Sequence, residues 1–248
     1  MSNLITVYIT NHNYGKYLEE SIKSVLKQSY KNFFLIIIDD NSKDDSKLIL
    51  QKYKKNKKIK IFCNKKSVGL TKCANFALKK SKGGYLLRLD ADDLLKKSAL
   101  KDLLNVAKKN KKTMMVFPNF YNINERSKVT SSFNYKHKLE YNLYDTPAHG
   151  ACSLINANFL RKIGGYNENF SRQDGHYLWY SILSKKKKIT HINKYLFFYR
   201  KHKKNISKNK KKILLVRLKI INFFLKRKLF IDEFENQKKL TKKRLRVL

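Results

Sequence analysis

Short apolar runs alternate with helical patterns through the first half of the chain, and this alternation constrains the fold more than any other feature. The runs are four to seven residues long, as is typical of buried parallel strands, and lie at residues 4–10, 33–39, 60–63, 85–90 and 114–117. Between them, apolar residues recur on one helix face, at Leu18 and Ile22, at Leu70 and Ala74, and at Leu100 and Leu104. Repetition of strand, helix and strand predicts an α/β fold with a Rossmann-like, doubly wound, mostly parallel sheet.

Polar clusters follow three of the predicted strands. TNHN begins at Thr10, DDNS begins at Asp39 and DADD begins at Asp90. In a parallel α/β sheet, ligands bind beyond the carboxyl ends of the strands, so these clusters mark the candidate site. Asp and Asn also start turns and cap helices, which would explain the first two clusters without any ligand.

The DADD cluster holds three carboxylates, Asp90, Asp92 and Asp93, within four residues. Like charges this close raise one another's pKa, and a chain tolerates them best where a cation neutralises them. Hard oxygen donors with no adjacent His or Cys suit Mg²⁺ or Mn²⁺ that also binds a substrate phosphate. The cluster therefore predicts a divalent-metal site.

The chain is strongly basic, with 57 Lys and Arg against 18 Asp and Glu and a formal net charge of +39. Such a charge raises nucleic acid or an anionic membrane as a partner. The basic residues are spread along nearly every polar segment instead of forming one stripe with aromatic residues, which favours a solvated surface. We therefore expect no specific nucleic-acid partner.

The cysteines and the N-terminus indicate the compartment. Cys63, Cys73 and Cys152 are far apart and form no CxxC pair, which predicts neither a zinc site nor a disulfide framework. The chain does not begin with a basic segment and a long apolar core, and it has no run of about eighteen apolar residues that could span a bilayer. We expect a cytoplasmic protein.

Four ordered segments resemble the family 2 glycosyltransferases, which have the GT-A fold. The nucleotide-binding half of that family is similar to VYITNHNYGKYLEESIKSVLKQSYKNFFLIIIDDNSKDDS and VGLTKCANFALKKSKGGYLLRLDADD. Its acceptor half is similar to HGACSLINANFLRKIGGYNENFSRQDGHYLWYSI and YRKH. The resemblance covers residues 4–202. It implies one domain over residues 1–202, with a nucleotide-binding half at about 1–95 and an acceptor half at about 96–202.

The resemblance also implies an activity. It predicts a metal-dependent, inverting transferase that moves a sugar from a nucleotide-sugar donor, most simply a UDP-linked one. The acceptor would be a hydroxyl of a glycan or of a lipid-linked acceptor in surface polysaccharide or lipopolysaccharide synthesis. Mn²⁺ or Mg²⁺ would be the cofactor.

Individual residues take donor-binding roles from the resemblance. Asp40 would accept the N3–H of a uracil-type base, Thr10 would hold the base edge through its backbone, and His12 would stack on the base. Lys72 would lie near the diphosphate. The remaining predicted donor-binding residues are Asn13 in TNHN, Asp90 and Asp92 in DADD, and His149 and Gly150 in PAHGACSL.

The metal and the catalytic base are assigned in the same way. Asp92 and Asp93 would ligate the metal, although some relatives use the positions of Asp90 and Asp92 instead. His202 is similar to a histidine that ligates the metal or touches the diphosphate. Asp174 resembles the general base that takes the proton from the acceptor hydroxyl, and its alternative role is to cap the helix that it begins.

Residues 203–248 form a basic, partly apolar extension. Residues 201–248 carry eighteen Lys or Arg against three acids, and residues 213–225 are apolar almost all round a helix. This helix could pack on the domain or lie on an anionic membrane, where each nearby Lys or Arg adds about 1 kcal/mol. We favour docking of this helix on a membrane surface, which would make the protein peripheral on the cytoplasmic face.

Two alternative functions follow from the same residues. A nucleotidyltransferase also combines an α/β sheet, carboxylates and Mg²⁺, but it predicts a Gly-rich or basic loop after the first strand, which TNHNYGKYL lacks. A nucleic-acid-binding module would use the Lys-rich surface and leave the acids as helix caps. Salt-sensitive binding of any RNA, without binding of a nucleotide sugar, would favour that module.

Overall fold

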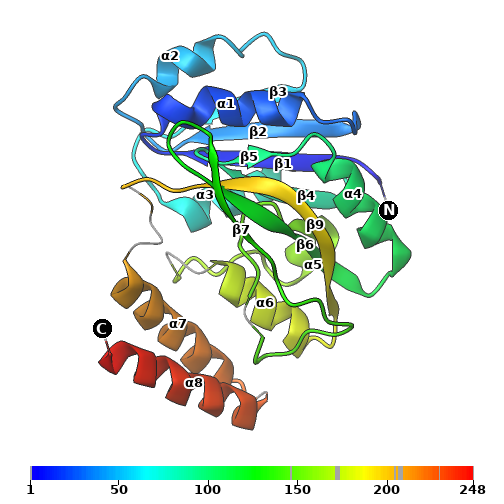
Figure 1. Cartoon of the computed structure of the whole chain (residues 1–248), viewed down its shortest axis with the longest axis vertical. Coiled ribbons are helices and arrows are strands. Elements are labelled where there is room, and N and C mark those ends of the chain that lie inside the picture. The colour runs from blue at the N-terminus through cyan, green and yellow to red at the C-terminus, as the bar shows by residue number, and fades with distance from the viewer. Residues whose placement is uncertain are drawn as a thin grey trace.

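The fold centres on one mixed β-sheet with helices on both faces (Figure 1). The computed structural model describes residues 2–145, 147–170, 174–203, 205, 209–228 and 230–247, and only the backbone of Asp174. Within these residues the strand order is β3-β2-β1-β4-β8-β6-β9-β5, and β7 pairs with β6.

Four parallel strands form the first half of the sheet, as the apolar runs predict. They are β1 (Ile5–Asn11), β2 (Phe33–Asp39), β3 (Ile59–Cys63) and β4 (Tyr85–Asp90). The connecting helices are α1 (Gly15–Leu26), α2 (Ser46–Gln51) and α3 (Leu70–Lys80). Thr10 of β1 pairs with Ile38 of β2 and with Asp90 of β4. The carboxyl ends of these three strands are therefore level, and the polar clusters that follow them meet at one edge.

The second half of the sheet is mixed. The strand expected at residues 114–117 is part of a longer strand, β6 (Thr113–Ile123), and β8 (Leu154–Asn156) lies between it and β4, antiparallel to both. β9 (Lys188–Arg200) runs parallel to β6. The other elements here are β5 (Leu94–Leu95), antiparallel to β9, β7 (Val129–Phe133), antiparallel to β6, and the helix α4 (Ala99–Lys109). Six of the described strands share one direction, which confirms a mostly parallel sheet.

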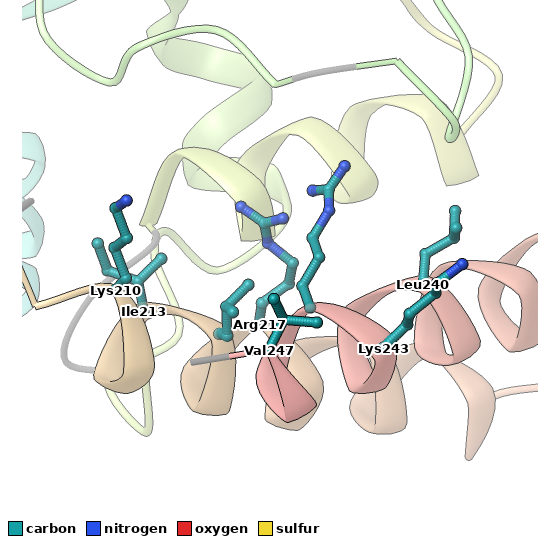
Figure 2. A pocket seen from close by; sticks show the side chains of 8 residues that line it. Lys210, Ile213, Arg217, Leu240, Lys243 and Val247 are labelled. Carbon is teal, nitrogen blue, oxygen red and sulfur yellow. The ribbon is translucent and has the colours of Figure 1, made fainter.

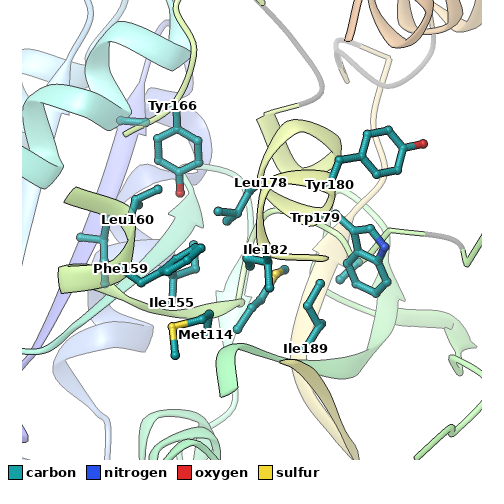
Figure 3. Close-up of a cluster of buried hydrophobic side chains, with 14 of the residues drawn as sticks. Met114, Ile155, Phe159, Leu160, Tyr166, Leu178, Trp179, Tyr180, Ile182 and Ile189 are labelled. Carbon is teal, nitrogen blue, oxygen red and sulfur yellow. The ribbon is translucent and has the colours of Figure 1, made fainter. Parts of the chain in front are cut away.

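Side chains of the parallel strands alternate between two hydrophobic cores on opposite faces. In β1, Ile9 is completely buried in one core and Tyr8 in the other. α1 and α4 cover the first core. α3, α5 (Ala157–Lys162) and α6 (Asp174–Ser184) cover the second, and Figure 3 shows it around Trp179 and Ile182. This coverage of both faces explains why the strands appear in the sequence as continuous apolar runs.

The two glycines after α5 end that helix. Gly164 and Gly165 have φ angles of 84° and 79°, which favour glycine, and the N–H of Gly165 donates to the carbonyl of Leu160 at 2.9 Å. The backbone N–H of Tyr166 then donates to Asn75 Oδ1 on α3 at 2.8 Å. The turn after α5 is thereby held against α3.

The C-terminal segment forms two helices that pack on the domain. α7 (Lys210–Leu225) and α8 (Ile231–Arg246) lie side by side next to α6 (Figure 1). Phe224 of α7 stacks on Phe234 of α8 with ring centroids 5.2 Å apart, and Phe234 also meets Tyr180 of α6 at 5.1 Å. α6 and α8 cover apolar residues of α7, so this helix packs on the domain, and docking of the segment on a membrane surface stays a prediction. Among the described residues, no helix combines the length and apolarity needed to cross a bilayer.

Candidate active site

A cavity of about 590 Å³ lies at the carboxyl ends of β1, β2 and β4. Predicted site residues from both halves of the chain line it, namely Thr10, His12, Asp40, Asp90, Asp92, His149 and Gly150. The sheet register explains this convergence, since Thr10 and Asp90 are paired neighbours and Asp40 directly follows β2. The remaining predicted residues, Asn13, Lys72, Asp93 and His202, do not line the cavity, and the side chain of Asp174 lies outside the described part of the chain.

Asp40 is buried and fixes the segment that follows β3. One carboxylate oxygen accepts from Asn64 Nδ2 and from the N–H of Val68, both at 2.8 Å. The other accepts from Ser67 Oγ at 2.7 Å and from the N–H of Gly69 at 2.9 Å. Burial alone would raise the pKa of Asp40, but these hydrogen bonds outweigh it and lower the pKa below its ordinary value. Asp40 is therefore a charged side chain that holds one wall of the cavity.

The TNHN segment contributes one exposed ring and one folded turn. The Nδ1–H of His12 donates to the backbone carbonyl of Asp40 at 2.7 Å, which leaves the exposed ring along the cavity wall. Asn13 has a positive φ of 63°, and its side-chain oxygen accepts from the N–H of Lys43 at 2.7 Å. Asn13 therefore shapes the turn instead of facing the cavity. Lys72 is exposed on α3 and is not brought to the cavity either.

Asp90 is paired with an arginine from the same strand. Arg88 Nε lies 2.9 Å from Asp90 Oδ1, and the exposed fractions of the two side chains are 7% and 27%. Gly150 leaves room for this guanidinium, since a Cβ there would lie 2.8 Å from Arg88 Nη2. Arg88 was not among the predicted site residues, although a charged residue in the middle of the apolar run YLLRLD was a usable signal.

The other two carboxylates of DADD point in different directions. Asp92 lines the cavity, and its Oδ2 lies 2.8 Å from His202 Nε2. Asp93 is completely buried, and one of its oxygens accepts from the N–H of Arg200 at 2.8 Å while the other has no hydrogen-bond partner. Burial first, and then the charges of Asp92 and Asp90, raise the pKa of Asp93 well above its ordinary value. Of the two alternative metal pairs, only Asp90 and Asp92 both face the cavity.

Arg200, which was not among the predicted site residues, holds the DADD turn by hydrogen bonds. Its Nε donates to the carbonyl of Asp92 at 2.7 Å, and its Nη2 donates to Glu20 at 2.6 Å. Its guanidinium also stacks over the ring of Tyr17, 4.7 Å from the centroid. The same residue thereby positions Asp92 by its side chain and Asp93 by its backbone. YRKH contained the signal, because Arg200 stands two residues before His202.

The side chains around Asp92 are compatible with a divalent cation whose remaining ligands come from a bound substrate. Among the residues that the structure describes, no three His, Cys, Asp or Glu side chains converge as a closed metal site. Asp92 and His202 nevertheless bring one carboxylate and one imidazole together, with Asp90 on the same wall. Mg²⁺ and similar cations are commonly held by one or two carboxylates plus substrate phosphates, so this open arrangement is compatible with such a metal.

The start of α6 forms part of the cavity wall. Asp174 is the first residue of α6, and the next two residues, Gly175 and His176, line the cavity. Desolvation, together with the nearby charge of Arg217, lowers the pKa of His176 well below its ordinary value. The predicted base therefore begins a helix whose first turn faces the cavity, and Gln173 lies outside the described residues.

Comparisons with known proteins agree on one family. The family model described as Glycosyl transferase family 2 matches residues 6–164. The UDP-Glc:alpha-D-GlcNAc-diphosphoundecaprenol beta-1,3-glucosyltransferase WfaP of Escherichia coli is 30% identical over 216 residues, which cover 86% of this chain and 83% of the relative. WfgD of Escherichia coli, which carries the same enzyme description, is 29% identical over 214 residues, covering 85% of this chain and 82% of the relative.

Solved structures show the same fold at low identity. TarS 1-349 of S. aureus in complex with UDP has a TM-score of 0.69 and 20% identity, covering 89% of this chain and 65% of that chain. The mannosyltransferase PcManGT of Pyrobaculum calidifontis, solved with GDP-Man and Mn²⁺, has a TM-score of 0.71 and 12% identity, covering 90% of this chain and 64% of that chain. The chain thus spans just under two thirds of the length of these two structures.

Proposed function

The chain belongs to glycosyl transferase family 2 and is a glycosyltransferase of the GT-A fold, and we propose that it transfers a sugar from a UDP-linked donor to a lipid-linked glycan acceptor with the help of a divalent cation. The observation that carries this proposal is the convergence of Asp90, Asp92 and the first turn of α6 on one cavity. Its volume of about 590 Å³ lies within the range of small-molecule sites.

Different parts of the nucleotide-sugar donor would lie at different strand ends. The nucleotide base would lie beside His12 and the wall held by Asp40, with Thr10 at its edge, because all three residues line the cavity and His12 is hydrogen-bonded to the backbone of Asp40. The diphosphate would lie at Asp90 and Asp92, with the donor sugar along His149 and Gly150. When bound beside Asp92 and His202, Mn²⁺ or Mg²⁺ would neutralise charge on the diphosphate leaving group, an effect worth several kcal/mol in the transition state.

Attack by the acceptor would be assisted by Asp174. The carboxylate would take the proton from the acceptor hydroxyl while the hydroxyl oxygen bonds to the anomeric carbon and the diphosphate leaves from the opposite side. Such a displacement inverts the anomeric centre. A positioned general base contributes roughly 10²- to 10⁴-fold to the rate.

The donor and acceptor classes are supported by the relatives. The two Escherichia coli relatives are named for UDP-glucose and for a lipid diphosphate that carries one sugar, and each is matched over more than four fifths of its length. TarS 1-349 was solved with UDP, and PcManGT was solved with GDP-Man. UDP-linked glucose is therefore the first donor to test and GDP-mannose is the comparison.

A thermal-shift panel tests this function. A ligand that binds only the folded state stabilises it by about 2.7 kcal/mol at a hundredfold excess over its dissociation constant. With Mn²⁺ present, UDP-glucose should raise the melting temperature of the wild type and of Asp232→Asn, a control that removes an exposed acid of α8 outside the cavity. Asp92→Asn should lose the Mn²⁺-dependent part of the shift.

The panel can also contradict the proposal. Stabilisation by GDP-mannose but not by any UDP-sugar would show that the donor is GDP-linked instead of UDP-linked. An equal shift with and without Mn²⁺ would remove the cation from donor binding. Stabilisation by no nucleotide sugar, together with salt-sensitive RNA binding, would contradict the transferase mechanism as a whole.

A further inference from the structure

A second cavity, of about 580 Å³, lies between α7 and α8 (Figure 2). Its basic lining consists of Lys210 and Arg217 from α7 and Lys243 and Arg244 from α8. The other lining residues are aliphatic, such as Leu214. We call this cavity the α7–α8 groove.

The charge of the α7–α8 groove has one sign. All four ionisable residues of its described lining are basic, and that lining includes no carboxylate. Desolvation and the nearby charge of Arg244 lower the pKa of Arg217, and the buried Nε of Arg217 has no hydrogen-bond partner. Bringing like charges together beside apolar side chains is costly unless an anion compensates them. The groove therefore has the chemistry of a site for an amphipathic anion.

The groove adjoins the active-site cavity. Ile213 lines both cavities, and within the same turn of α7 Lys210 faces the groove and Lys212 faces the active site. Arg217 also lies close enough to His176, on the active-site wall, to lower the pKa of that imidazole. A molecule in the groove could thus extend past the first turn of α7 to the start of α6, where Asp174 stands.

We propose that the α7–α8 groove is the subsite for the diphosphate and the first isoprenoid units of the lipid-linked acceptor. This inference rests on the proposed function, in which one sugar joins the reacting hydroxyl to the diphosphate. In such an acceptor the diphosphate must lie one sugar away from the general base, Asp174. This spacing agrees with two cavities that adjoin each other. Guanidinium groups bind phosphate oxygens in pairs, and the aliphatic lining would shelter the lipid chain from water.

Isothermal titration calorimetry with farnesyl diphosphate tests the proposal on the full-length protein without requiring a donor or an acceptor sugar. The double variant Lys243→Gln with Arg244→Gln removes two basic residues of the groove from exposed positions of α8. The control, Lys239→Gln with Lys242→Gln, removes the same charge from exposed positions of the same helix outside the groove. We expect the groove variant to bind at least about tenfold more weakly than the wild type, because it loses two charged donors to phosphate, and the control to stay within about twofold.

Three outcomes would overturn the inference. If both double variants bind farnesyl diphosphate equally weakly, the basic residues of α8 attract any anionic surface without a specific site. Vesicles of phosphatidylglycerol would then bind in the same way. Inorganic pyrophosphate that binds as tightly as farnesyl diphosphate would indicate a free-phosphate site, because the lipid would contribute nothing. Absence of farnesyl diphosphate binding to the wild type would leave the groove without the proposed occupant.

The Mn²⁺-dependent shift with UDP-glucose, measured on the same proteins, separates the two proposals. If the groove variant loses farnesyl diphosphate but keeps the donor shift, the groove is supported independently of the donor site. If the wild type binds farnesyl diphosphate but shows no shift with any nucleotide sugar, the proposed function fails while the groove stands.

Discussion

Replacing Arg200 should destabilise the protein and loosen the DADD turn, although Arg200 does not line the active-site cavity. Its side chain is completely buried and donates from Nε to the carbonyl of Asp92 at 2.7 Å and from Nη1 to Ser127 Oγ at 2.9 Å. Nη2 donates to Glu20 at 2.6 Å. Arg200→Met keeps much of the volume and removes every donor of the side chain.

The loss of stability in Arg200→Met depends on which hydrogen-bond partners of Arg200 can bond to water instead. Asp92 is buried, so its carbonyl stays unsatisfied at a cost of about 1–3 kcal/mol. Ser127 is only partly buried, and the side chain of Glu20 is 53% exposed, so both can bond to water. Adding the lost stacking on Tyr17, we expect Arg200→Met to lower the free energy of unfolding by roughly 2–4 kcal/mol. Glu20→Gln should cost less than Arg200→Met, because a Gln side-chain oxygen at this 53% exposed position can still accept from Arg200 Nη2.

Urea unfolding measures this difference directly, because the only tryptophan, Trp179, is completely buried and reports the loss of the core by its fluorescence. Donor binding should weaken in Arg200→Met as well, since Asp92 loses the contact that positions its backbone. A cost of less than about 1 kcal/mol for Arg200→Met, or an equal cost for Glu20→Gln and Arg200→Met, would contradict this role of Arg200.

Three further perturbations test other parts of the structure. Gly150→Ala puts a Cβ 2.8 Å from Arg88 Nη2, at the movable end of that side chain, so we expect a stability cost of about 1 kcal/mol and a severalfold rise in the dissociation constant for the donor, measured by titration. Because hydrogen bonds lower the pKa of Asp40, its carboxylate stabilises the fold above about pH 4, and this contribution is lost as the pH falls through the lowered pKa. The difference in unfolding free energy between wild type and Asp40→Asn should therefore shrink on acidification from pH 6 to pH 3, and a constant difference would speak against it. Ending the chain at Lys203 removes Phe224 and Phe234 from the aromatic contacts of α6, so we expect the truncated chain to lose cooperative unfolding in urea, and a fully stable truncated protein would contradict this packing.

The first half of the fold was predictable because its strands are buried on both faces. β1, β2 and β4 consist almost wholly of buried residues, so each appears as a continuous apolar run with a helical pattern after it. β8 has only three residues, and β5 has two, which is too short for a recognisable periodicity. These strands depend on their neighbours in the sheet, and no local pattern specifies those neighbours.

The candidate site was predictable as a set of strand ends, but not in its internal pairing. Thr10, Asp40 and Asp90 follow from the sheet topology, since parallel strands bring their carboxyl ends together. The direction of each DADD carboxylate depends on distant partners, because Asp93 turns toward Arg200, more than a hundred residues later.

The C-terminal helices show a similar limit. An almost wholly apolar helix is compatible with a membrane surface and with a second protein layer. Only the structure shows that Phe234 of α8 closes over Phe224 of α7.

The most direct test of the central claim measures donor binding and sugar transfer in Asp174→Asn. The amide can still cap α6 but cannot accept a proton, and the donor contacts come from the strand ends. With Mn²⁺, we predict donor affinity within a few-fold of wild type, and transfer to an N-acetylglucosamine diphosphate lipid reduced by roughly 10²- to 10⁴-fold. Transfer at a rate close to wild type would remove Asp174 from the mechanism, and a parallel loss of donor binding would make its role structural.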